Sequence, residues 1–128
     1  MLDASNLNGL PDLVITLDKS IRRCEIIDKS GSIVVAASRE NVQPVITDDE
    51  HYKEALQAAI RNFTTPSWAR AFGEKIYSVS RYEKLIIANI TLSDRHLMLV
   101  SFDLDTDNFD EIIMKKIRPK NKLLFKPC

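Results

Sequence analysis

The stretch CEIIDKSGSIVVAAS, residues 24–38, decides the fold of this chain. Two apolar runs flank the tetrapeptide DKSG, whose Asp28 is suited to bond the backbone amides ahead of it. Gly31 supplies the positive φ angle that a tight antiparallel turn requires. The segment therefore predicts a β-hairpin with strands at residues 22–27 and 32–38.

Apolar periodicity predicts one helix before this hairpin and one after it. The first has Pro11 in its first turn and an apolar stripe at the spacing of a helix face. The stripe consists of Leu10, Leu13, Val14, Leu17 and Ile21. The second helix begins at the capping box TDDE, in which Thr47 and Glu50 satisfy each other's backbone amides. One face of this helix collects Tyr52, Leu56, Ala59, Ile60 and Phe63.

A three-strand meander and a last helix complete the predicted order. Residues 75–82 alternate small polar and apolar side chains, as an edge strand does. Residues 84–92 and 96–102 are apolar on both faces, which is typical of central strands. The last helix begins near Asn108 and stops at Pro119. We therefore expect an α+β fold, a five-stranded antiparallel sheet with helices packed on it, in the order α-β-β-α-β-β-β-α.

The totals predict one soluble domain and exclude several classes of protein. A chain of 128 residues, 45% hydrophobic, suits a single domain at 1–128, with a loosely held basic tail from about residue 119. Its 18 basic and 18 acidic residues cancel, which argues against binding to nucleic acid. No apolar run is long enough to span a bilayer, and the N-terminus lacks the pattern of a signal peptide. We therefore expect a cytoplasmic protein without stable membrane insertion.

The arrangement resembles the roadblock/longin/profilin-like group, and within it roadblock domains most. The residues that carry the resemblance are SIRRCEIIDKSGSIVVAAS (20–38), TDDEHYKEALQAA (47–59) and RYEKLIIANITLSDRHLMLVSFD (81–103). The resemblance covers about residues 10–118 and is greatest to a group of small archaeal proteins of this shape. It implies a homodimer that serves as a scaffold or regulator, commonly of a small GTPase. The segments RENVQPVI and TTPSWARAFG, on either side of the second helix, depart from a minimal roadblock domain.

No group of residues converges on a catalytic or cofactor site. Asp103, Asp105 and Asp107 fall at the first, third and fifth positions of an EF-hand loop. Asn108 and Met114 stand where that loop needs its glycine and its closing glutamate. We interpret these acids as the end of a strand and the cap of the last helix, rather than as a calcium site. We expect no metal, no cofactor and no enzymatic activity.

Two parts of the chain are candidate contact surfaces. Trp68 and Phe72, beside Arg70, form either an exposed recognition patch or a lid that packs on the core, and we favour the lid. The other candidate is a homodimer interface made of a slim helix face and an edge strand. It consists of Ala55, Ala58, Ala59, Ser78, Val79 and Ser80.

Two functions of different classes are compatible with these features. The first is a non-enzymatic protein-interaction or scaffold module that forms a homodimer and regulates a small GTPase. The alternative is a ligand-sensing domain of PAS-like type, which would hold a small ligand between sheet and helix with Trp68 as the gate. The second function needs a cavity between sheet and helix with Trp68 over it, whereas a filled interface between sheet and helix favours the first.

Overall fold

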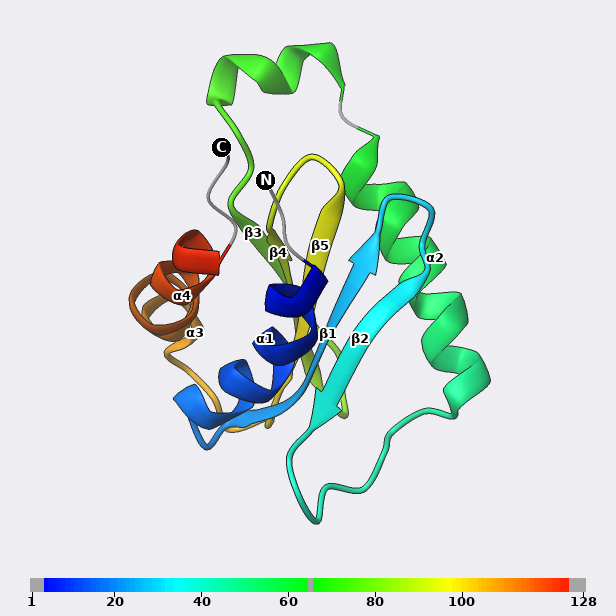
Figure 1. The fold of residues 1–128 in the computed structure, drawn as a ribbon, viewed down its shortest axis with the longest axis vertical. Coiled ribbons are helices and arrows are strands. Elements are labelled where there is room, and N and C mark those ends of the chain that lie inside the picture. The colour runs from blue at the N-terminus through cyan, green and yellow to red at the C-terminus, as the bar shows by residue number, and fades with distance from the viewer. Residues whose placement is uncertain (1–3, 65, 125–128) are drawn as a thin grey trace.

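The fold is a five-stranded antiparallel sheet with helices on both faces (Figure 1). The structure is a computed structural model, which describes residues 4–64 and 66–124. Its strands lie in the order β2-β1-β5-β4-β3, so β2 and β3 are the two edges. The predicted fold class and the predicted order of elements are confirmed.

The described part of the chain begins and ends with a helix, and two further helical segments separate the first two strands from the last three. The elements are α1 (Ala4–Leu17), β1 (Ile21–Asp28), β2 (Ile33–Ser38), α2 (Asp48–Phe63), the 3-10 helix η1 (Ser67–Phe72), β3 (Tyr77–Arg81), β4 (Ile86–Thr91), β5 (His96–Phe102), α3 (Phe109–Glu111), the π-helical turn η2 (Ile112–Ile117) and α4 (Arg118–Leu124). None of the helices within the described ranges is both long and apolar enough to cross a bilayer.

The β1–β2 hairpin closes as its sequence predicts. The Asp28 carboxylate accepts hydrogen bonds from the backbone amides of Ser30 and Ser32, each at 3.0 Å. Gly31 adopts a φ of 90°, which a residue with a side chain rarely tolerates. The aspartate and the glycine thus fix the turn between them.

Two hydrophobic cores of unequal size lie on the two faces of the sheet. The larger one packs α1 and the helix α3–η2–α4 against the inward residues of all five strands, with Phe102, Met98 and Cys24 fully buried. The smaller one packs α2 against β1 and β5 through Ile27 and Leu97. In Figure 1, α1 and α3–α4 lie on one side of the sheet and α2 lies alone on the other.

The first helix is longer than predicted. It begins at Ala4, so Pro11 lies in its interior and not in its first turn. An interior proline removes one backbone hydrogen bond and costs about 3 kcal/mol. Leu7, Leu10 and Val14 are buried against the sheet, and this packing outweighs the cost.

The last helix does not stop at Pro119, so that prediction is wrong. Residues 109–124 form one helix, in which the wider π turn η2 ends two residues before the proline. In a regular α-helix the proline ring would clash with the carbonyl four residues earlier. The π turn inserts an extra residue at that point, as π-bulges do. The predicted basic tail is therefore helical through Leu124, and residues 125–128 lie outside the described residues.

Replacing Gly31 by valine is expected to lower the free energy of unfolding more than replacing Gly73 does. Both glycines have positive φ, 90° and 85°, so either valine is strained by about 1 kcal/mol or more. A Cβ at Gly31 would also lie 2.8 Å from Leu56 Cα, whereas nothing lies within 4 Å at Gly73. We expect a further loss of about 1–3 kcal/mol at Gly31, measured by urea denaturation. Equal losses would show that the hairpin does not press on α2.

Candidate functional site

Helix α2 turns its small residues toward the sheet and three of its large apolar residues toward solvent. Its start is fixed as predicted, because the Glu50 amide donates to the Thr47 hydroxyl and the Thr47 amide donates to the Glu50 carboxylate. The sheet-facing side is made of Ala55, Ala58 and Ala59, all of them buried. The opposite flank carries Tyr52, Leu56 and Ile60, which are 61%, 48% and 55% exposed. We call these three residues the outer stripe.

The burial of the three alanines corrects one part of the predicted homodimer interface. Ala55, Ala58 and Ala59 were expected to admit a second copy of the helix, but they pack on Ile27 and Leu99 of the same chain. Small side chains allow a helix backbone to approach a sheet closely, and in this fold α2 packs closely on its own sheet. Any partner of α2 must therefore contact another side of the helix.

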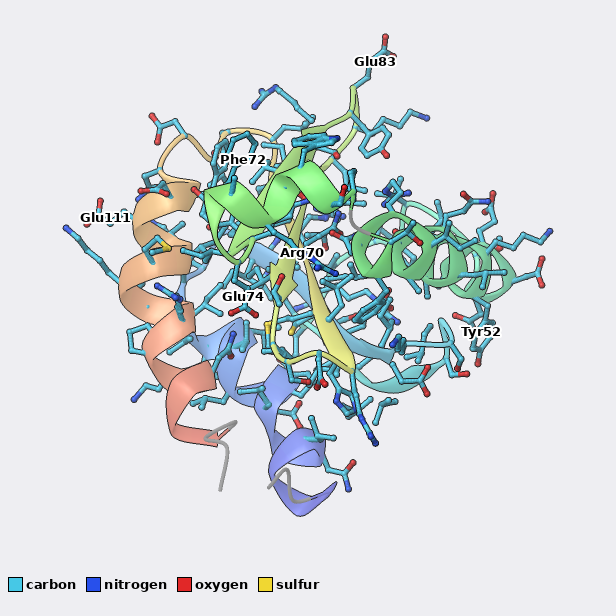
Figure 2. The ribbon with its side chains drawn as sticks, turned by 90° about the horizontal axis from the view of Figure 1, so that it is seen from above. Tyr52, Arg70, Phe72, Glu74, Glu83 and Glu111 are labelled. Atoms are coloured by element: carbon cyan, nitrogen blue, oxygen red, sulfur yellow. The ribbon has the colours of Figure 1, made fainter. Side chains whose placement is uncertain are left out.

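The outer stripe of α2 faces one edge of the sheet, and β3 forms the other edge. Leu56 lies against Gly31 in the β1–β2 hairpin, so the stripe faces the β2 side of the sheet. Glu54, on the other flank, lines a cavity together with Leu85 and Ile87 at β4. Figure 2 shows Tyr52 toward the hairpin, and Glu83 of the β3–β4 turn far from it. The helix and the strand thus offer two separate surfaces, not one.

Strand β3 is an edge of the sheet, as predicted. It pairs with β4, where Ser78, Val79 and Ser80 lie opposite Asn89, Ala88 and Ile87. Val79 packs against the larger core, so Ser78 and Ser80 project to the α2 face of the sheet. These three residues remain our prediction for the strand part of a homodimer interface.

The aromatic residues of η1 do not form a lid. Trp68 is 65% exposed and Phe72 is 81% exposed, and their rings meet edge to face with centroids 5.6 Å apart. Arg70 is exposed beside them, and Figure 2 shows η1 at one end of the sheet. The interpretation of this segment as a lid on the core is therefore wrong. Its role as a recognition patch stays a prediction.

The acidic run after β5 forms ion pairs, and the side chain of Asn108 does not cap the helix that follows. Asp103 forms ion pairs with Arg22 and Arg39, each at 3.1 Å, and the hydrogen bond from Arg39 is the main cause that lowers its pKa. Asn108 stands at the N-cap of α3, but its side chain makes no capping hydrogen bond. No group of three or more His, Cys, Asp or Glu side chains in the described ranges is placed to hold a metal ion.

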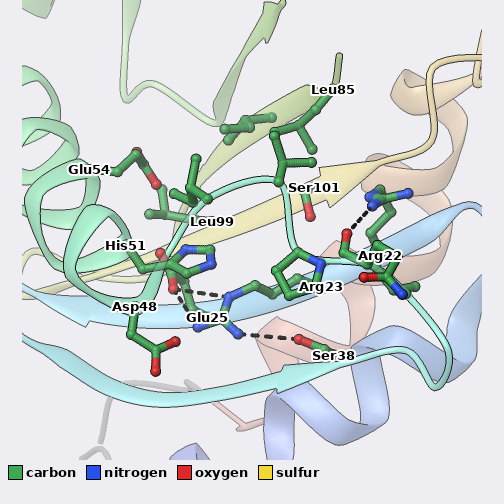
Figure 3. Close-up of a pocket in the computed structure, with 16 residues that line it drawn as sticks. Arg22, Arg23, Glu25, Ser38, Asp48, His51, Glu54, Leu85, Leu99 and Ser101 are labelled. Atoms are coloured by element: carbon green, nitrogen blue, oxygen red, sulfur yellow. Dashed lines mark hydrogen bonds and ion pairs between the residues drawn. The ribbon is translucent and has the colours of Figure 1, made fainter.

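A cavity of about 120 Å³ lies between α2, the sheet and the segment of residues 42–46, which we call the strap. Val42, Leu85, Ile87 and Leu99 supply apolar walls. Figure 3 shows the strap crossing over the sheet, with His51 and Glu54 of α2 facing Glu25 of β1. The cavity thus lies between sheet and helix, where a ligand-sensing domain would need one, but Trp68 does not line it.

Two carboxylates from different elements meet at this cavity. Glu25 is 3% exposed and accepts hydrogen bonds from Arg23 Nε and Nη2, at 3.4 and 3.1 Å. Burial raises the pKa of Glu25, and Arg23 acts in the opposite direction. Burial, and then the nearby charge of Glu25, raise the pKa of Glu54 to about 7. Arg61 is 4.0 Å from Glu54 and compensates this charge only in part.

The neighbouring histidine completes the cluster. Burial, and then the charge of Arg23, lower the pKa of His51, so its imidazole is neutral at pH 7. This cluster was not predicted from the sequence. Its one signal was Glu25 itself, an acid inside the apolar run CEII, which needs a partner when the strand is covered on both faces.

Glu54→Gln is expected to stabilise the protein at pH 8 by about 1–3 kcal/mol. The carboxyl has a pKa of about 7 in the folded chain and an ordinary value of 4.5, so the folded state binds the proton more tightly. Its contribution to stability is therefore full below pH 4.5 and is lost as the pH rises to 7. The variant should lose this part of the pH dependence, measured by urea denaturation from pH 5 to pH 8. Asp49→Asn, which removes an exposed acid of the same helix, is the control. A variant whose stability follows the wild-type pH curve would contradict the raised pKa of Glu54.

Comparison with known proteins finds similarity in structure and not in sequence. No model of a protein family and no curated protein matches the chain. Myxococcus xanthus MglB matches with a TM-score of 0.71 at 16% identity, over 97% of this chain and 88% of that one. An MglB described with a tetrameric arrangement has a TM-score of 0.71 at 15% identity, over 92% and 84%. A roadblock/LC7 domain from Streptomyces avermitilis has a TM-score of 0.69 at 12% identity, over 92% and 93%. The chain therefore has the roadblock/LC7 fold.

Proposed function

We propose that this chain is a non-enzymatic protein-interaction module that forms a homodimer through β3 and presents the outer stripe of α2 to a partner protein. The outer stripe is the observation that carries the proposal. Its residues Tyr52, Leu56 and Ile60 are large, apolar and about half exposed, on one flank of a helix. A helix that serves only its own fold places such residues inward.

The chemistry of the stripe suits a protein surface as partner. Isoleucine and leucine provide apolar area, and Tyr52 adds a ring with a polar tip, a residue type enriched where interfaces bind most strongly. Asp49 and Lys53 on the same helix carry charge next to it. Apolar centres with polar rims are typical of protein–protein interfaces.

The homodimer is supported by the free edge of β3. The strand offers unpaired backbone groups, and its Ser78 and Ser80 side chains carry no charge that would repel a second strand. Two copies related by a two-fold axis would extend the sheet across both chains. One protein of similar fold is described in a tetrameric arrangement, so this fold is compatible with self-association.

The partner class comes from the resemblance to roadblock domains, which implies a small GTPase. A folded GTPase would meet the outer stripe as a surface, and the stripe lies away from β3, so both contacts fit on one chain. A cytoplasmic location and a place among the small archaeal members of the roadblock group complete the proposal.

Ser80→Lys is expected to convert the dimer to a monomer, because a charged side chain on an edge strand opposes pairing with a second strand. Ala36→Lys is the matched control, since it puts the same charge at an exposed position of the other edge strand, β2. Light scattering after size exclusion at tens of micromolar measures the mass. A monomeric wild-type protein would overturn the homodimer, and dissociation by Ala36→Lys alone would move it to β2.

Ile60→Glu is expected to weaken binding to a small GTPase of the same organism by tenfold or more, because it puts a charge into an apolar contact. Gln57→Glu adds the same charge at an exposed polar position of α2 and should leave binding unchanged. Titration calorimetry with the GTPase in its GDP and GTP-analogue states measures both. Equal affinities of the two variants would remove the outer stripe from the proposal.

A further inference from the structure

We infer that the cavity beneath the strap is a binding site for a small organic cation, an ammonium ion with a short apolar body. This inference is independent of the proposed function, because the cavity lies on the flank of α2 opposite the outer stripe. It rests on the shape of the cavity, on the apolar character of its walls and on the distribution of charge around it.

The size of the cavity sets the size of the ligand. It encloses about 120 Å³. In another protein, an apolar cavity of about 150 Å³ holds one benzene molecule. A ligand of about five to seven non-hydrogen atoms therefore fits, such as a butylammonium ion.

The walls determine how such a molecule lies. Leu85, Ile87 and Leu99 come from the sheet, and the strap closes the opposite side with Val42 and Val45. These side chains suit a hydrocarbon chain. The acids Glu54 and Glu25 lie where α2 passes over β1, beside His51, whereas Arg22, Ser38 and Ser101 line the other side of the cavity (Figure 3). The cavity thus combines apolar walls with a few polar groups, as small-molecule sites commonly do.

The charges around the cavity favour a cation over an anion. Both arginines that line the cavity are already paired, Arg22 with Asp103 at 3.1 Å and Arg23 with Glu25 at 3.1 Å. Arg22 also donates to the Gln43 carbonyl of the strap at 2.9 Å. Their charge and their donors are therefore committed to the fold.

Glu54 is the acid that these pairs leave undercompensated. Its ion-pair partner among the described residues is Arg61, at 4.0 Å, and its side chain is 25% exposed. A half-buried carboxylate in an apolar setting gains most from a cation that brings its own charge and donors. An ammonium ion beside Glu54, with its chain along Ile87 and Leu99, meets this need.

The experiment is a titration at pH 8 followed by amide shifts in ¹⁵N spectra, with butylammonium, butanol and butyrate as probes. We expect saturable shifts at the strap and at residues 51–54 with butylammonium, at low-millimolar concentration or below. Butanol has the same apolar body without the charge and should bind at least tenfold more weakly. Butyrate should not bind, because Glu25 and Glu54 repel it. No saturable shift, shifts elsewhere, or equal affinity for butanol would overturn the inference.

Glu54→Gln tests the residue assigned to the ammonium group. The amide keeps the shape of the side chain and should remove the preference for butylammonium over butanol. Asp49→Asn is the matched control, since it removes an exposed acid of the same helix that pairs with Lys53 and does not line the cavity. Preference retained in Glu54→Gln, or lost equally in both variants, would show that the charge of Glu54 is not what selects the ligand.

The pH supplies a second readout that a purely apolar cavity would not show. The charged and titratable groups around the cavity and Glu54 are Arg22, Arg23 and Glu25 on β1, and Asp48, His51 and Arg61 on α2. The strap, β4 and β5 line the cavity with uncharged residues. Because the Glu54 pKa is about 7, the carboxylate is mostly neutral at pH 5.5, whereas an alkylammonium ion keeps its proton. Affinity for butylammonium should fall several-fold from pH 8 to pH 5.5, and affinity for butanol should not. A pH-independent affinity would exclude Glu54 as the contact.

Discussion

The close contact between the alanine face of α2 and strands β1 and β5 determines how this helix is oriented on the sheet. Because Ala55, Ala58 and Ala59 fill the contact, the helix lies near enough to the sheet for Gly31 to be required at the hairpin turn. The same contact rotates Tyr52, Leu56 and Ile60 outward. It also sets Glu54 near Glu25 and leaves a cavity beside the two carboxylates. One helix orientation thus produces both candidate surfaces.

The contact between α2 and the sheet contains few large side chains, and the ion pair of Arg23 and Glu25 lies beside it. Glu25 is buried on β1 and is paired with Arg23, which in turn donates to Ser38 on β2. Burying such a pair costs desolvation energy that an apolar pair would not, so it adds little net stability. Its effect is on the neighbouring helix: the charge of Glu25 raises the pKa of Glu54 to about 7. We therefore expect the stability of the fold to depend on pH near neutrality.

The sequence predicted the fold well where local chemistry decides it. DKSG closes its hairpin and TDDE starts its helix, because each signal acts within a few residues. It failed where the outcome depends on distant packing. Large apolar residues on one helix face normally point inward, and nothing local shows that a slim alanine face would be chosen instead. Pro119 stays inside a helix in which a π turn precedes it, and Glu25 lies near Glu54 because α2 is stacked on the sheet.

Because the outer stripe and Glu54 lie on one helix, binding at either flank of α2 could affect binding at the other. The outer stripe and Glu54 belong to a single helix of sixteen residues, so a change in its position moves both. A cation beside Glu54 would stabilise the orientation in which α2 lies close to the sheet, and that orientation is the one that exposes Leu56 and Ile60. If a partner binds this exposed form, the two ligands favour the same state. Thermodynamic linkage then requires each to strengthen the binding of the other by the same factor. A cation beside Glu54 and a partner on the outer stripe would then be coupled through the position of one helix.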